Sequence, residues 1–150
     1  MVALKAGGSN VSVEAASRLV YGYGAGIDLT RRDLQKAAKD GRRPWDASKA
    51  FDGSAPIGAI VPAEHAALEG ASHIELRVND VLCQQACVGD MIWSVPEVIS
   101  ALSKLFELKA GDLIFTGTPA GVGPLVVGDA VVGTVEGVGS VTVHIGNPQS

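Results

Sequence analysis

The chain lacks an excess of positive charge and any long apolar run, and each absence excludes a class of protein. Its 150 residues carry a formal net charge of −4 at pH 7, whereas binding to nucleic-acid phosphates relies on a basic surface. No apolar run approaches the roughly 18–20 residues needed to span a bilayer. Hydrophobic residues make up 47% of the chain and charged residues 19%, which excludes a disordered chain. We therefore expect no nucleic-acid partner and no membrane partner.

Cysteine is also scarce. Cys83 and Cys87 are four positions apart, a spacing that forms neither a CxxC redox pair nor half of a zinc site. We interpret them as reduced thiols in the core or at an interface, which is typical of a cytosolic protein. The opening residues, MVALKAGG, contain no secretory cleavage pattern. These features predict a cytoplasmic location.

Glycine, by contrast, is abundant. Nineteen glycines with 5% aromatic residues are typical of tight turns and closely spaced strands. The clearest strand signal runs from 73 to 78, where Ile74, Leu76 and Val78 alternate onto one face before a turn and a returning strand over 81–87. Because such alternation dominates the second half, we predict an α+β fold with β dominant. The length suits one domain over 1–150.

Capping signals place the helices. Thr30 and Gly41 would start and stop a helix over 31–39, and Ser94 with Glu97 forms a capping box before another helix. A short helix is predicted over 13–18. Further strands are predicted over 1–5, 20–29, 56–61, 113–116, 130–136 and 140–145.

The segment over 26–51, GIDLTRRDLQKAAKDGRRPWDASKAF, gathers acidic, basic and amide side chains near the end of a predicted strand. Asp28 would end that strand, and a carboxylate there suits Mg²⁺ or Mn²⁺, which prefer oxygen ligands. An aspartate that bonds the loop beside Thr30 would explain the same residue. A single carboxylate is a minimal metal site.

Three further polar side chains in this segment are candidates for binding an oxoacid. Arg32 and Gln35 are three apart on the predicted helix and so share a face, where a guanidinium and an amide could hold a carboxylate or carbonyl. A solvated helix face, with Arg32 paired to Asp33 or Asp28, is the alternative. Lys49 lies among apolar residues, where an ammonium can stabilise an enolate or oxyanion, although a surface lysine is commoner.

The stretch over 116–123, TGTPAGVG, fits neither the P-loop nor the GxGxxG pattern, so no nucleotide site is predicted. It can instead present a hydroxyl and backbone N–H groups to an oxygen-rich ligand, or be a plain turn. His65, His73 and His144 are scattered, with no Ser or Cys nucleophile arranged beside them. None of the three is assigned a catalytic role.

Five segments together resemble the fumarylacetoacetate hydrolase family over nearly the whole chain: GIDLTRRDLQ, GRRPWDASKAFD, SAPIG, MIWSVPEVIS and GDLIFTGTPAGVGPL. Within the family, acylpyruvate and fumarylpyruvate hydrolases are the most similar, chiefly through TRRDLQ and the RPW…KAFD…SAPIG run. The resemblance implies a β-roll or sandwich of mixed sheets with short helices, of the family's C-terminal domain type. It also implies a homodimer and a divalent metal, Mg²⁺ or Mn²⁺.

The resemblance further implies roles for five residues. Asp28 matches a metal carboxylate, and Lys49 matches the lysine beside the metal. Arg32 and Gln35 match residues that hold the oxoacid end of the substrate, and Thr118 matches the threonine of the substrate loop. The implied reaction is hydrolysis of a C–C bond in an acylpyruvate-type 1,3-dicarbonyl such as fumarylpyruvate, in aromatic catabolism.

Family members carry a Glu-x-Glu pair of metal ligands and a lid with a His–Glu pair, both upstream of the strand with which this sequence opens. We therefore expect a domain that is incomplete on its N-terminal side. Two alternatives stay open. One is an isomerase or an oxaloacetate-type decarboxylase on the same scaffold, and the other is a non-catalytic fragment that binds a small oxoacid without turnover.

Overall fold

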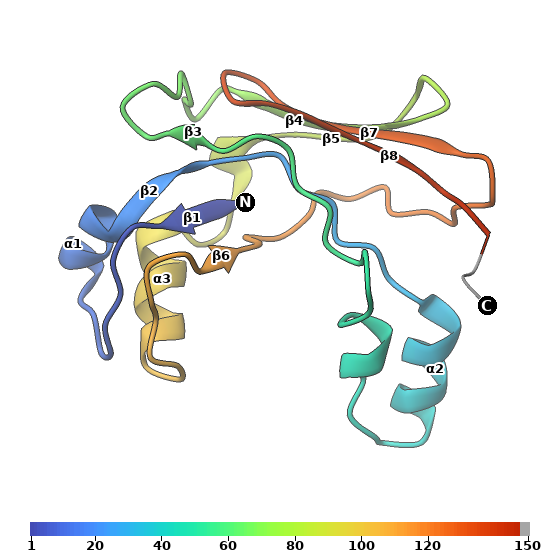
Figure 1. Ribbon diagram of the computed structural model, residues 1–150, viewed down its shortest axis with the longest axis horizontal. Coiled ribbons are helices and arrows are strands. Elements are labelled where there is room, and N and C mark those ends of the chain that lie inside the picture. Colours follow the sequence, from blue (N-terminus) through green and yellow to red (C-terminus); the bar gives the residue numbers. More distant parts are fainter. Residues whose placement is uncertain (148–150) are drawn as a thin grey trace.

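Two four-stranded antiparallel sheets form the framework of the computed structural model, which describes residues 1–147 (Figure 1). The first sheet contains, in spatial order, β3 (Val61–Pro62), β2 (Val20–Tyr23), β1 (Val2–Leu4) and β6 (Leu113–Ile114). The second contains β5 (Val81–Cys87), β4 (His73–Val78), β7 (Ala130–Val135) and β8 (Gly139–His144). The predicted α+β class with β dominant is confirmed, but every pairing in these sheets is antiparallel, where mixed sheets were expected.

Three short α-helices accompany the sheets: α1 (Val13–Ala16), α2 (Arg32–Asp40) and α3 (Val95–Ser103). Single 3₁₀ turns lie at Ser17–Leu19, Asp46–Ser48 and Val88–Asp90. α3 begins with the predicted capping box, in which the Ser94 backbone N–H donates to the Glu97 carboxylate at 2.7 Å. No helix in the described part of the chain is both long and apolar enough to cross a bilayer.

The first hydrophobic core fills the space between the first sheet and the pair formed by α1 and α3. Val2 and Leu4 from β1 pack there with Ile99 of α3, whose side chain is fully buried. Ala16 completes the contact between the two helices.

The second core lies beneath the inner face of the second sheet. Ala25 and Ile27, from the segment that follows β2, pack against Val131, Val135 and Val141. The alternating residues of β4 also face this core, as the sequence predicted, and the hairpin of β4 and β5 forms over the predicted residues, with a register shift between Leu76 and Arg77. The segment after β2 is thereby fixed under the second sheet, and it carries Asp28.

The predicted strand over 20–29 ends at Tyr23. Beyond it, residues 24–29 run beside residues 54–58 through separate backbone hydrogen bonds, including Ile27 N–H to the Pro56 carbonyl at 3.0 Å. Only the bridge from Gly26 to Ile57 is formed there. Pro56 has no N–H to donate, so a regular ladder cannot form at that position. Of the strand predicted over 56–61, only Val61 is in a strand, and β3 is confined to two residues.

α2 and the 3₁₀ turn after it project away from the two sheets (Figure 1). The helix ends at Gly41, as predicted, but it begins at Arg32 with Arg31 in the capping position. The predicted cap by Thr30 is wrong, because its hydroxyl lies 3.5 Å from the carbonyl oxygen of Asp28, two residues back. The guanidinium of Arg31 lies 4.2 Å from the ring centroid of Phe51, and this contact joins the start of the lobe that contains α2 to its end.

The cysteines are free, as predicted, but the core position is wrong for Cys83, which is exposed. Cys83 lies on β5, an edge strand of the second sheet, so it has a neighbouring strand on one side only. Cys87 is half-buried at the end of the same strand. The strand predicted over 113–116 is shorter than expected and ends at Ile114.

Candidate active site

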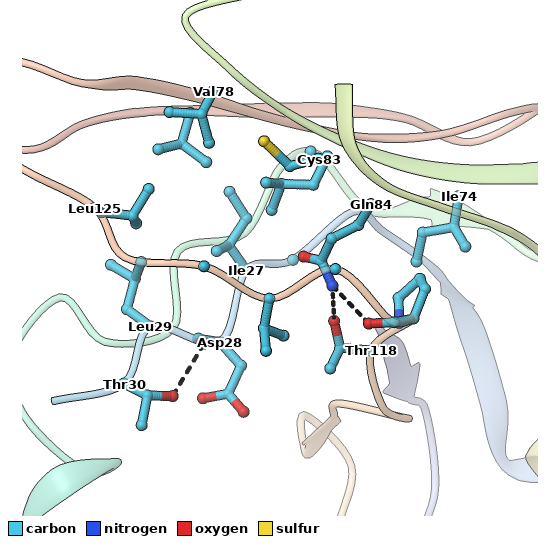
Figure 2. Close-up of a pocket in the computed structure, with 18 of the residues that line it drawn as sticks. Ile27, Asp28, Leu29, Thr30, Ile74, Val78, Cys83, Gln84, Thr118 and Leu125 are labelled. Atoms are coloured by element: carbon cyan, nitrogen blue, oxygen red, sulfur yellow. Dashed lines mark hydrogen bonds between the residues drawn. The ribbon is translucent and has the colours of Figure 1, made fainter. Parts of the chain in front are cut away.

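A cavity of about 620 Å³ opens beneath the second sheet, bounded by the segment after β2, the loop that follows β6, and the base of the α2 lobe (Figure 2). Four of the five residues singled out from the sequence line it: Asp28, Arg32, Lys49 and Thr118. The apolar part of its lining includes Ile27, residues of β4 and β7, and the rings of Phe51 and Phe115. Polar groups from three separate chain segments thus converge on one mostly apolar cavity, which is typical of a small-molecule site.

Asp28 and Lys49 form an ion pair at the edge of this cavity. The Lys49 Nζ lies 2.6 Å from the Asp28 Oδ2, although the residues are 21 apart in sequence. The backbone brings them together, because the Arg31 N–H donates to the Ser48 carbonyl at 3.0 Å, directly before Lys49. The two side chains are 51% and 39% exposed, so solvent and ligands can reach the pair.

Arg32 and Gln35 share one face of α2, as their spacing predicted. The Arg32 Nη1 donates to the Gln35 Oε1 at 3.0 Å, and Gln35 is buried. Arg32 lines the cavity whereas Gln35 does not. Gln35 therefore fixes the guanidinium of Arg32 from behind, and in this structure it is Arg32 that reaches the cavity.

Thr118 lies in the loop after β6, and its hydroxyl is held by a residue that the sequence interpretation missed. The Gln84 Nε2 donates to the Thr118 Oγ1 at 2.9 Å and to the Pro119 carbonyl at 2.7 Å (Figure 2). Gln84 is on β5 and only 7% exposed. A sequence signal existed, because Gln84 is opposite the core-facing Leu76 in the hairpin, and an amide at such an inward position needs a partner.

Among the described residues, two carboxylate residues line the cavity, Asp28 and Glu75. Glu75 accepts hydrogen bonds from Gln85 and Arg77, so Asp28 is the candidate carboxylate for a hard divalent ion. Within residues 1–147, no three His, Cys, Asp or Glu side chains cluster closely enough to make a metal site. Mg²⁺ sites commonly combine one or two carboxylates with water and substrate oxygens. The residues here therefore fit one part of such a coordination shell, and the other ligands must come from water, a bound oxoacid or further protein.

Comparison with known proteins identifies the family. Residues 2–146 match the model of the fumarylacetoacetate (FAA) hydrolase C-terminal family. The chain belongs to the fumarylacetoacetate hydrolase family. This assignment places the Asp28–Lys49 pair and the Thr118 loop in a family of enzymes.

Relatives within the family carry more than one activity in their names. A fumarylpyruvate hydrolase of Ralstonia sp is 44% identical over 139 residues, covering 93% of this chain and 72% of that protein. An oxaloacetate tautomerase of Escherichia coli (strain K12) is 42% identical over 125 residues, covering 83% of this chain and 57% of that protein. The chain thus spans between about half and three quarters of the length of these two relatives.

Among solved structures of this family, a fumarylpyruvate hydrolase from Pseudomonas aeruginosa, in complex with Mn²⁺ and pyruvate, superimposes with a TM-score of 0.93 at 41% identity. The match covers 98% of this chain and 63% of that one. A maleylpyruvate hydrolase from Sphingobium sp. SYK-6 superimposes with a TM-score of 0.82 at 32% identity, over 98% of this chain and 52% of that one. These similarities confirm the fold expected from the sequence.

Proposed function

We propose that this chain forms the catalytic domain of a divalent-metal-dependent hydrolase that cleaves a C–C bond in an acylpyruvate such as fumarylpyruvate. The observation that carries the proposal is the Asp28–Lys49 pair, which shares one cavity with Arg32 and Thr118 in a chain of this family. The relatives named as fumarylpyruvate hydrolases, one of them with Mn²⁺ and pyruvate bound, support the substrate class and the metal. Mg²⁺ is the other ion that this chemistry would accept.

The reaction balances as the addition of one water molecule. The oxygen of water adds to the ketone carbonyl of the acyl part, which is the one farther from the 2-oxoacid carboxylate, and the bond between that carbon and the CH₂ of the pyruvate part breaks. The acyl part leaves as a carboxylic acid, and the other part leaves as the enolate of pyruvate, which then takes a proton on carbon. The enolate is where negative charge accumulates, so a cation held near it lowers the barrier.

Each cavity residue has a defined part in this proposal. Asp28 would contribute one carboxylate ligand to a divalent ion, which when bound supplies Lewis-acid polarisation of the dicarbonyl oxygens. Lys49 would place its ammonium beside the developing enolate. Arg32, held by Gln35, would bind the carboxylate end of the substrate, and Thr118 would hydrogen-bond one of its oxygens, which together fix the reactive geometry.

The direct test is release of pyruvate from fumarylpyruvate, with Mn²⁺ or Mg²⁺ and again with a chelator. We expect metal-dependent turnover, and we expect Asp28→Ala to abolish the metal dependence. Asp33→Ala is the matched control, because Asp33 lies in the exposed first turn of α2 and does not line the cavity. If Asp28→Ala retains metal-dependent turnover like that of Asp33→Ala, the assignment of Asp28 is wrong.

A second candidate is favoured by the relatives named as oxaloacetate tautomerases, which are 38–42% identical to this chain. Tautomerisation would use the same cation to stabilise an enolate but would break no C–C bond. Following the enol absorbance of oxaloacetate, alongside pyruvate release from fumarylpyruvate, separates the two. Faster equilibration of oxaloacetate without cleavage of fumarylpyruvate would favour the tautomerase.

We also propose that the protein acts in the cytoplasm as a homodimer, binding a small oxoacid and neither nucleic acid nor membrane. The edge strand β5 supports an association surface, because Val81 and Leu82 at its start are exposed apolar residues next to unpaired backbone groups. Sedimentation equilibrium of the purified protein tests the dimer. A mass equal to one chain over the whole concentration range would contradict it.

A further inference from the structure

The amide of Gln84 connects the second sheet to the loop that carries Thr118. Gln84 projects from β5 toward the cavity side of the sheet, and its Nε2 lies within hydrogen-bond distance of two oxygens, the Thr118 Oγ1 and the Pro119 carbonyl (Figure 2). The two acceptors are consecutive in the chain, so one side chain fixes both. The amide is buried, so water does not compete for these bonds.

The chemistry of these partners settles which end of the amide faces them. The Pro119 carbonyl oxygen can only accept a hydrogen bond, so the group 2.7 Å from it must be the NH₂ of Gln84. The same nitrogen is 2.9 Å from the Thr118 hydroxyl, and an amide nitrogen only donates. The Thr118 oxygen is therefore an acceptor toward Gln84.

A hydroxyl carries a single hydrogen, and that of Thr118 is not used in the bond from Gln84. We propose that Gln84 is a positioning residue that turns the Thr118 hydroxyl into a hydrogen-bond donor toward the cavity. The site would then favour a ligand with an acceptor oxygen at this point, such as a carboxylate or carbonyl oxygen, over one that presents only donors, such as an ammonium. The inference rests on the proposed function only in taking the ligand to be an oxoacid.

The loop is held against β5 at a second point, which makes the position of Thr118 dependent on this strand. Gly121 has a φ of +100°, and a Cβ built there would lie 2.1 Å from the Cys83 carbonyl oxygen. The backbone of the loop thus touches β5 one residue before Gln84. With the backbone fixed there, removal of the Gln84 amide frees chiefly the Thr118 end of the loop.

The test compares steady-state kinetics on fumarylpyruvate for wild type, Gln84→Met, Thr118→Val and the double variant. Methionine keeps the length of glutamine and removes both hydrogen-bond donors. In the proposed function Thr118 would contact the substrate both before and during the reaction, so we expect Gln84→Met to raise KM about 10-fold with a smaller change in kcat. In the Thr118→Val background, the same change should have less than about a 2-fold effect, because the residue through which Gln84 acts has lost its hydroxyl.

Gln85→Met is the matched control. Gln85 is the next residue on β5, is exposed, does not line the cavity, and donates to the Glu75 Oε1 at 3.0 Å. We expect wild-type KM for this variant. If Gln84→Met does not fold, Gln84→Glu replaces it, since a carboxylate is nearly isosteric yet cannot donate to the Pro119 carbonyl when ionised.

Three results would overturn the inference. The first is a KM within 2-fold of wild type for a folded Gln84 variant, and the second is an equal effect of Gln84→Met with and without the Thr118 hydroxyl. The third does not depend on activity: a crystal structure of the Gln84 variant in which Thr118 keeps its rotamer. If wild type does not cleave fumarylpyruvate, the proposed function fails, and the Thr118 rotamer alone decides this inference.

Discussion

Lys49→Met separates the catalytic role proposed for the ammonium from any role in folding. The side chain of Lys49 is 39% exposed, and that of its partner Asp28 is 51% exposed, so water screens the pair despite the 2.6 Å distance. Ion pairs of this kind contribute about 0–1 kcal/mol to the free energy of unfolding. For a chain of this size, a loss of 1 kcal/mol lowers Tm by about 2–4 °C. The variant should therefore remain folded.

The effect on catalysis should be much larger. Loss of one group that stabilises an oxyanion typically lowers kcat about 10²–10³-fold. We expect a decrease of that size for pyruvate release from fumarylpyruvate at saturating Mn²⁺. Thermal unfolding measured on the same samples checks that the loss is not due to unfolding.

Lys36→Met is the control for this experiment. The Lys36 Nζ lies 2.6 Å from the Asp40 Oδ2, the same distance as in the Lys49 pair, but both side chains are on the exposed face of α2 and outside the cavity lining. We expect unchanged kcat and a similarly small change in Tm. A kcat for Lys49→Met within 5-fold of the Lys36→Met value would mean that the Lys49 ammonium does not stabilise the enolate.

Three further predictions concern stability. Ile99→Ala should lower the free energy of unfolding by about 2–5 kcal/mol, measured by urea denaturation, because it empties a fully buried position in the first core; a loss below 1 kcal/mol would contradict this. Ser94→Ala should cost about 1 kcal/mol by the same assay, since it removes the capping side chain of α3, and no loss would mean that the capping box is not needed. Backbone N–H donation from His73, followed by its side chain, lowers the pKa of Glu136. A lowered carboxyl pKa stabilises the fold at pH values above the ordinary pKa of about 4.3, and this stability is lost as the pH falls through the pKa of the folded state. Glu136→Gln removes this contribution, so it should flatten the acid side of a plot of Tm against pH. An unchanged curve would contradict the prediction.

The hairpin of β4 and β5 and the start of α3 were predictable because their signals are local. Alternation over six residues fixes which side of a strand faces the core, and a Ser with Glu three residues later satisfies helix N–H groups within one turn. The segment after β2 was not predictable in the same way. Its apolar residues suggested a continuing strand, but its partner contains Pro56, and a propensity for one strand carries no information about the other.

In the candidate site, too, contacts between residues close in sequence were predictable and contacts between distant segments were not. The spacing of Arg32 and Gln35 predicted a shared helix face, and the structure has them in contact. No spacing rule joins Lys49 to Asp28, because their contact depends on a backbone hydrogen bond between segments on either side of α2. Their association came instead from the family resemblance. The inward position of Gln84 indicated that its amide needs a partner, but its partners are 34 and 35 residues away, and only the fold shows which they are.

A crystal structure of this protein grown with Mn²⁺ and pyruvate would show directly whether this cavity is the active site. We expect a metal ion bound to the Asp28 carboxylate, with the ammonium of Lys49 beside it. We also expect an oxygen of pyruvate within hydrogen-bond distance of the Thr118 hydroxyl. Well-diffracting crystals with pyruvate bound outside this cavity, or with Mn²⁺ on other side chains and Asp28 unligated, would contradict this assignment.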